Sequence, residues 1–269
     1  MFFVKRGPFV NKMGCVLELM VGKILFGEQV GGTIVQKEQL KELVELGFFY
    51  YSSGQNKEAI RYFKQALKVC ERADIYNNLG LVHLNDGDYG KAVNAFKKAL
   101  NIDPSYLPAF YNLGVTMYYA RSYDVAANIF EDVGKAKGLE KELLASAHND
   151  RGCALNRKGD LEKAEQSYEA ALVIDDKFIR PYVNLGNLYC NKGDFDKAKM
   201  KYNKALELDE KCAAAYNGLG VVAVEESKLE EAEKYFDKAL EVDKNCTAAK
   251  VNKMILKKHA DAAESKEAK

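Results

Sequence analysis

Residues 179–212 read IRPYVNLGNLYCNKGDFDKAKMKYNKALELDEKC, and this arrangement of small, aromatic and polar residues returns along the chain. Its Leu-Gly pair contains one member of a glycine series: Gly47, Gly80, Gly114, Gly152, Gly186 and Gly220. The intervals in this series are 33, 34, 38, 34 and 34 residues. A period near 34 residues indicates a repeat architecture, in which one supersecondary unit is copied and stacked.

Two further series keep the same intervals. The alanines are Ala59, Ala92, Ala126, Ala164, Ala198 and Ala232, and the aromatics are Phe63, Phe96, Phe130, Tyr168, Tyr202 and Phe236. Small residues allow two helix axes to approach closely, and aromatic rings fill the space between them. We therefore expect each unit to be a pair of antiparallel helices.

The turn inside each helix pair has its own signals. Further glycines stand where this turn is expected, at Gly54, Gly87, Gly159 and Gly193. Asp88, Asp160 and Asp194 follow three of them, where a carboxylate oxygen can cap the start of the second helix. No single pair can bury its apolar face alone, so neighbouring units are expected to stack.

These residues resemble the pattern of the tetratricopeptide repeat (TPR) family over roughly 40–246. The resemblance implies an all-α fold, a right-handed TPR superhelix (α-solenoid) of about six helix-turn-helix repeats. The expected repeats are 40–72, 73–106, 107–144, 145–178, 179–212 and 213–246. The 38-residue interval is interpreted as a surface insertion or as a bend. A capping helix (247–259) and a frayed, charged tail (260–269) are expected to follow.

The segment 1–39 stands outside the repeat, and an amphipathic helix is expected in it at about 12–26. Its apolar stripe is Met13, Val16, Leu17, Met20, Val21, Ile24 and Leu25. Three interpretations stay open. The helix covers the flank of the first repeat, contacts another copy or a partner, or lies on a membrane surface. The third is disfavoured, because its polar face carries few basic residues.

Composition limits the partners and the cellular location. Lys plus Arg number 40 and Asp plus Glu number 39, so nothing favours binding to nucleic acid or to an anionic membrane. The six cysteines show no CxxC spacing, so we expect neither a metal site nor a disulfide. Reduced thiols and the lack of a clear secretory signal favour the cytoplasm. No cofactor is expected.

Catalysis is not expected. Of the three histidines, His83 and His148 occupy slots held by tyrosines in other repeats, which predicts packing roles. His259 lies near the expected frayed end. The chain contains no phosphate-binding glycine loop, no HExxH and no nucleophile elbow. We therefore predict a protein that is not an enzyme.

The TPR resemblance implies a concave groove, lined by the first helix of each repeat, that binds an extended peptide. An asparagine series follows the repeat on these helices although asparagine is a poor helix former. A carboxamide can pair with both sides of a peptide unit. The predicted peptide-binding residues are Asn78, Asn112, Asn149, Asn184, Asn187, Asn252, Tyr111, Tyr118, Tyr119, Arg157 and Arg180. The alternative is that the asparagines only cap or bridge neighbouring helices.

One known TPR function is disfavoured. TPR receptors for the carboxylate tail of heat-shock chaperones use a clamp of Lys, Arg and Asn. The corresponding positions here are Val44, Phe48, Asn78, Pro108 and Asn112, and only Asn78 fits. The predicted function is a protein interaction scaffold or adaptor that holds an extended peptide. The alternative is a self-assembling scaffold, a homo-oligomer in which the amino-terminal helix contacts a neighbouring copy or a membrane surface.

Overall fold

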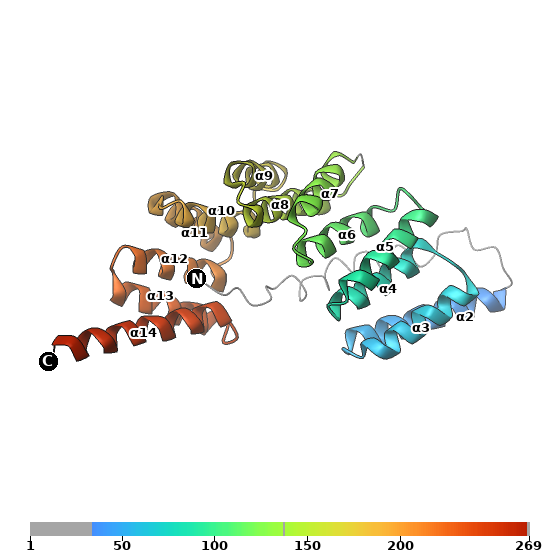
Figure 1. Cartoon of the computed structure of the whole chain (residues 1–269), viewed down its shortest axis with the longest axis horizontal. Coiled ribbons are helices and arrows are strands. Elements are labelled where there is room, and N and C mark those ends of the chain that lie inside the picture. Colours follow the sequence, from blue (N-terminus) through green and yellow to red (C-terminus); the bar gives the residue numbers. More distant parts are fainter. Residues whose placement is uncertain (1–33, 137, 268–269) are drawn as a thin grey trace. The chain divides into compact units, whose positions relative to one another are not determined.

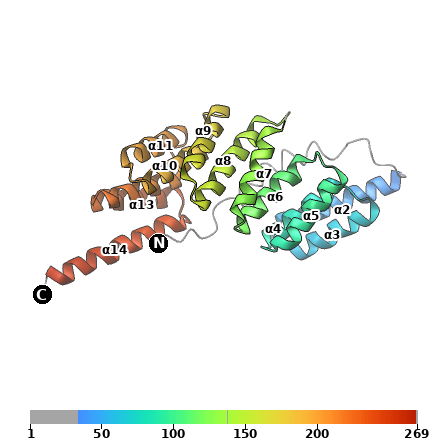
Figure 2. The ribbon, with the colours of Figure 1, turned by 45° about the horizontal axis from the view of Figure 1, so that its top comes forward.

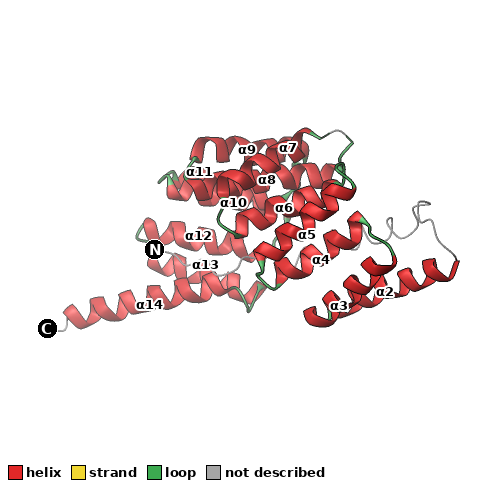
Figure 3. Cartoon of the chain, turned by 45° about the vertical axis from the view of Figure 1, so that its right-hand side comes forward, coloured by secondary structure: helices red, strands yellow, loops and turns green. Residues whose placement is uncertain are grey.

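The computed structural model describes residues 34–136 and 138–267, and its regular elements there are all helices (Figure 3). The chain divides into two units, one within Arg6–Lys137 and one within Gly138–Lys269 (Figure 1). The first unit contains α2 (Ile34–Ser52), α3 (Asn56–Val69), α4 (Ala73–Asn85), α5 (Tyr89–Ile102), α6 (Leu107–Tyr119) and α7 (Tyr123–Lys135). The second contains α8 (Lys141–Lys158), α9 (Leu161–Ile174), α10 (Ile179–Asn191), α11 (Phe195–Leu208), α12 (Ala213–Glu225), α13 (Leu229–Val242) and α14 (Thr247–Glu267). The expected all-α fold is confirmed.

The helices pair as the repeat predicts. The even-numbered helices α2 to α12 are the first helices of the six repeats, and the odd-numbered helices α3 to α13 are the second helices. All six alanines of the series are fully buried, and the aromatics are at most 1% exposed. A Cβ atom added to Gly47 would lie only 2.5 Å from the Phe63 ring. The Phe63 ring therefore fits only because residue 47 has no side chain.

The turns inside the pairs also follow the expectation. Gly54, Gly87, Gly159 and Gly193 have φ between 72° and 96°, a left-handed conformation that glycine adopts without strain. The side chains of Asp88, Asp160 and Asp194 accept hydrogen bonds from the backbone N–H groups of Lys91, Lys163 and Lys197. These aspartates satisfy one of the N–H groups that a helix start leaves without a partner.

Stacking joins each pair to the next within a unit. The second helix of a repeat packs on the first helix of the following one, as α3 does on α4 and α11 on α12. In the core between α3 and α4, Phe63 and Ala66 pack with Ile75, Leu79 and Val82. Each repeat therefore relies on its neighbour to bury its apolar residues.

Three helices are longer than the repeat requires. Helix α8 starts at Lys141, four residues before the place that matches the start of α10, so the extra residues of the 38-residue interval extend a helix. Helix α2 starts at Ile34, ahead of Leu40, which corresponds to the start of α4.

Helix α14 runs to Glu267, although an end at 259 and a frayed tail were expected (Figure 2). Residues 260–267 contain Ala, Glu and Lys, which favour helix even without packing. The expected amino-terminal helix at 12–26 lies outside the described residues.

Candidate functional site

From α4 onward, successive even-numbered helices of the same unit contact each other. Helix α4 contacts α6, and α8, α10, α12 and α14 contact in series. Side-chain amides join three of these junctions. Asn112 Nδ2 donates to Asn77 Oδ1, Asn184 Nδ2 to Asn149 Oδ1, and Asn252 Nδ2 to Asn217 Oδ1, each over 2.9 Å. We call these three hydrogen-bonded pairs the amide bridges.

Burial divides the asparagines into two groups. Asn77, Asn112, Asn149 and Asn252 are at most 9% exposed. Asn78, Asn184 and Asn217 are half-buried, and Asn187 is exposed. The buried asparagines bridge helices, which is the alternative role that the sequence left open. The second group retains surface that a ligand can reach.

The junction of α8 with α10 holds a cluster of polar side chains. Asn149 Nδ2 donates to Asp150 Oδ1 over 2.8 Å, and Arg180 Nη1 lies 3.6 Å from the same oxygen. Asp150 is only 2% exposed, so its charge depends on these partners. Arg180 Nη2 also donates to Ser146 Oγ over 3.2 Å. The cluster fixes the side chains of two predicted site residues, Asn149 and Arg180.

The half-buried Cys153 adjoins this cluster. Asn184 Nδ2 lies 3.4 Å from Cys153 Sγ. Burial raises the pKa of Cys153 to about 12, with the nearby Asp150 acting in the same direction. The thiol is therefore protonated at neutral pH and is a weak nucleophile.

The asparagine series is interrupted at Gly218 for a packing reason. A Cβ atom there would lie 2.3 Å from Tyr202 Cζ, so the tyrosine ring occupies the space of a side chain. The Tyr202 hydroxyl donates to Asn187 Oδ1 over 2.7 Å. Asn187 therefore has its acceptor engaged, while its side chain stays exposed.

The three predicted tyrosines pack against other rings. Tyr118 lies edge-on to Tyr119 and to Tyr123, with ring centroids 5.7 and 5.6 Å apart, and Tyr119 stacks with Tyr89 at 6.5 Å. Tyr111 lies 5.6 Å from Phe130. All three are half-buried. Their role as anchors for a ligand stays a prediction.

The two predicted arginines differ in surroundings. Arg157 is exposed in the last turn of α8. Arg180 is half-buried, and its guanidinium lies 4.7 Å from the centre of the Phe178 ring in addition to its contacts with Asp150 and Ser146. The structure thus brings Arg180, Asn149 and Asn184 together at one junction.

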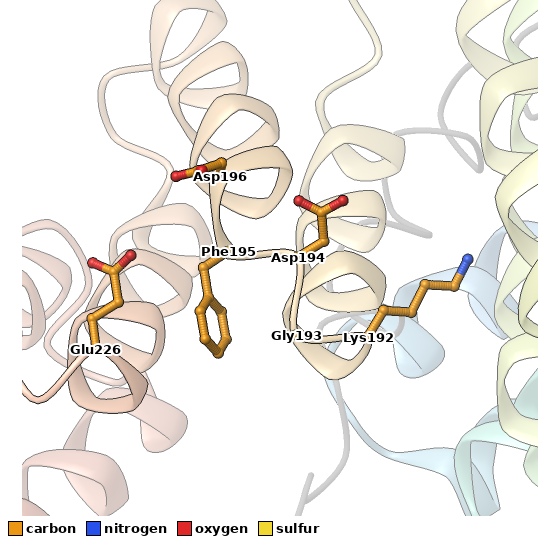
Figure 4. Close-up of a pocket in the computed structure, with 6 residues that line it drawn as sticks. All are labelled: Lys192, Gly193, Asp194, Phe195, Asp196 and Glu226. Carbon is orange, nitrogen blue, oxygen red and sulfur yellow. The ribbon is translucent and has the colours of Figure 1, made fainter.

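A surface hollow of about 460 Å³ lies between the turn after α10 and the turn after α12 (Figure 4). It is lined by Lys192, Gly193, Asp194, Phe195, Asp196 and Glu226. Its carboxylates are engaged: Asp194 pairs with Lys197, Asp196 with Lys199, and Glu226 with Lys199 and Lys228. These pairings leave little charge for a ligand.

The described part of the chain was also compared with the requirements of a metal site and of a membrane-spanning helix. No group of three or more His, Cys, Asp or Glu there could hold a metal ion. His83 is buried and His148 half-buried, and burial lowers the pKa of both imidazoles. Among the described helices, none has the length and apolar composition needed to cross a bilayer.

The bridging partners are what the sequence analysis did not place. Asn77 and Asn217 accept from asparagines 35 residues later, one more than the usual repeat interval. At all three bridges the two asparagines are 35 residues apart in the sequence. Asparagines at this spacing could therefore have been used to predict the bridges. Asp150 occupies the repeat position of Asn112 and Asn184, whereas Ser146 completed the α8–α10 cluster without such a signal.

The fold and these paired asparagines define a helical repeat protein, and comparison with known proteins identifies the family. Profiles of the tetratricopeptide repeat family match residues 42–105, 111–177 and 178–245. The chain belongs to the TPR family.

Individual relatives are more distant. Human protein O-mannosyl-transferase TMTC1 is 25% identical over 180 residues, which are 54% of this chain and 20% of that protein. MamA 41-end from Desulfovibrio magneticus RS-1 is 25% identical with a TM-score of 0.56, covering 65% of this chain and 97% of that chain. PilW, described as a widely conserved type IV pilus biogenesis factor, is 15% identical with a TM-score of 0.69, covering 82% and 99%. TPR repeats generally mediate protein–protein interactions, and a TPR scaffold is normally non-catalytic.

Proposed function

We propose that this protein is a scaffold or adaptor, without catalytic activity of its own, that binds an extended segment of a partner protein. The contacts lie along the first helices, on α4 and α6 in one unit and on α8, α10 and α12 in the other. The observation that carries the proposal is the set of amides arranged at repeat spacing, of which Asn78, Asn184 and Asn187 keep accessible surface. A cytoplasmic location is part of the same proposal.

The amide bridges support this function by holding side chains in place. Asn184 donates one N–H to Asn149, and its amide nitrogen also lies close to Cys153. These two contacts fix the plane of its carboxamide. A fixed carboxamide loses little rotamer freedom when a ligand binds, which favours affinity. Its oxygen can accept from a peptide N–H, and the Asn187 amide group can donate to a peptide carbonyl.

The ligand expected here is therefore recognised mainly through its main chain. Taken by itself, the first unit offers half-buried aromatic surface at Tyr118 and Tyr119, where an apolar side chain of a partner can bind. Aromatic side chains of this kind carry much of the binding energy in protein interfaces. Arg157 is exposed in the last turn of α8 and carries a positive charge, so an acidic residue in the ligand is favoured there.

A displayed library of twelve-residue peptides, selected on the full-length protein, supplies the probe. Fluorescence anisotropy then compares the wild type with the double variant Asn184→Ala/Asn187→Ala. Loss of two hydrogen bonds worth about 1 kcal/mol each predicts roughly 10- to 30-fold weaker binding. Tyr118→Ala is expected to lower the affinity for those peptides that carry an aromatic or aliphatic residue.

The matched control is Asn203→Ala, which removes an exposed asparagine from a second helix, α11. This variant should bind like the wild type. The proposed peptide binding would be refuted if the control and the double variant lowered the affinity equally. It would also be refuted if no peptide could be selected at all. Circular dichroism checks that helicity is unchanged in each variant.

A further inference from the structure

The first repeat exposes a face that every later repeat buries. In α2 this face contains Glu42, Leu46 and Phe49. Counting by the repeat, Phe49 corresponds to Val82, Thr116, Ala154, Leu188 and Val222, which are all at most 1% exposed. Phe49 itself is 60% exposed. Within each unit, the second helix of one repeat packs on the first helix of the next, as α3 does on α4 and α11 on α12, and so covers this position.

The same comparison holds along the helix. Leu46 is half-buried, whereas Leu79, Leu113, Leu185 and Leu219 at its position are at most 8% exposed. Glu42 is exposed, and its counterparts Ile75, Ala109, Ala147 and Ala215 are fully buried. We call Glu42, Leu46, Phe49 and Val35 the uncovered face. The array has a place for one more second helix there.

Helix α2 extends further at its amino-terminal end than the first helix of a repeat requires. Its added turns carry Val35, which is 71% exposed and lies seven residues before Glu42 and fourteen before Phe49. Residues seven, eleven and fourteen apart share one face of an α-helix. The uncovered face is thus about 21 Å long at 1.5 Å per residue.

We propose that residues 13–26 of this chain, which lie outside the described residues, cover this face as the missing second helix. The segment holds fourteen residues, the length of α3, α5, α9, α11 and α13. As a helix it would be about 21 Å long, which matches the uncovered face. Its apolar stripe repeats every three or four residues, as a covering helix requires.

The connection and the charges agree with this occupant. Residues 27–33 separate the segment from α2, and seven extended residues span up to about 25 Å. That reach is ample for the chain to reverse and run antiparallel to α2, since packed helix axes lie about 8–10 Å apart. Lys23, at the edge of the stripe, would meet the acidic side of α2, where Glu38 and Glu42 are exposed.

Hydrogen–deuterium exchange of the full-length protein tests the proposal. Amides in 13–26 should exchange at least 10-fold more slowly than an unstructured chain. Phe49→Glu should abolish that protection, because it places a charge in the covered face. Val173→Glu is the matched control: it changes an 87% exposed valine on α9 and should leave the protection intact.

A second variant guards against simple unfolding of the first repeat. Met20→Glu lies in the segment itself and should abolish protection of 13–26, while the amides of α3 stay protected. Glu18→Gln, off the stripe, should have no effect. The proposal fails if wild-type 13–26 exchanges freely, or if Phe49→Glu and Met20→Glu leave its protection unchanged. It also fails if protection grows with protein concentration alongside a dimer in light scattering, since a second copy is then the occupant.

Discussion

At the scale of single residues, two positions hold a backbone conformation that their side chains disfavour. Arg121 and Ser227 have φ of 63° and 61°, in the turns of the third and sixth repeats. Glycine stands at the corresponding place in the other four repeats. A residue with a Cβ atom is strained in the left-handed region, so these two turns are less favourable than the rest.

Replacing either residue with glycine should therefore stabilise the protein. We expect Arg121→Gly and Ser227→Gly each to raise the free energy of unfolding by about 0.5–1 kcal/mol, because relief of strain exceeds the added entropy of the unfolded chain. Urea denaturation measures the change. Ser122→Gly, at a neighbouring residue with φ of −84°, should give no gain. A gain of equal size there would point to a cause other than strain.

Close packing at Gly218 leads to a second prediction. Gly218→Ala should destabilise the protein by about 1–3 kcal/mol, since the new methyl group meets the Tyr202 ring. In a Tyr202→Ala background the cost should nearly vanish, which a double-mutant cycle measures. Gly90→Ala is the control: a Cβ atom there has no neighbour closer than 3.9 Å, and the change should be neutral or stabilising.

At the scale of helices, three of the second helices are capped by an aspartate that forms an ion pair with a lysine three residues later. Hydrogen bonds from Lys91, Lys163 and Lys197 lower the pKa of Asp88, Asp160 and Asp194 below the ordinary value. A carboxylate with a depressed folded-state pKa contributes stability that is present above its unfolded pKa. That contribution is lost as the pH falls through the folded pKa.

The acid dependence of stability should accordingly be reduced when these aspartates become asparagines. An asparagine still caps the helix but does not titrate, so it is a matched replacement. Between about pH 5 and pH 2, wild type should lose more stability than the Asp88→Asn/Asp160→Asn/Asp194→Asn variant. Chemical denaturation at each pH checks this. Parallel curves for the two proteins would show that other groups control the acid response.

The sequence predicted where the helices lie and how the two helices of a repeat pack. It did not predict the side-chain contacts between the first helices of consecutive repeats. The Gly, Ala and aromatic series followed directly from packing inside one pair, so Gly47, Ala59 and Phe63 could be placed by spacing alone. The amide bridges depend on how far one first helix is offset from the next. This offset pairs Asn77 with Asn112 rather than with the residue one repeat away. Similarly, the length of α14 depended on the propensity of its tail, which periodicity does not report.

At the scale of the whole molecule, stability should be local. Within each unit, a described repeat contacts the repeat beside it, so a strained repeat weakens its neighbours in the same unit first. In the Gly218→Ala variant, amide exchange should accelerate in α10–α13 and change little in α4 and α5. Hydrogen–deuterium exchange with mass spectrometry resolves the two regions. Uniform acceleration along the chain would show a single cooperative transition instead.

The amide bridges carry one consequence for how such a chain can grow. Bridges join Asn77 to Asn112, Asn149 to Asn184 and Asn217 to Asn252, whereas the α10–α12 contact has Val183 and Gly218 at the corresponding positions. Removing residues 179–212 alone would set Asn149 opposite Gly218 and leave a buried acceptor without its donor. Removing 179–246 would set Asn149 opposite Asn252, and the bridge would re-form. In the second unit, a pair of repeats, and not a single repeat, is therefore the segment whose removal keeps the donor and acceptor of the bridge matched.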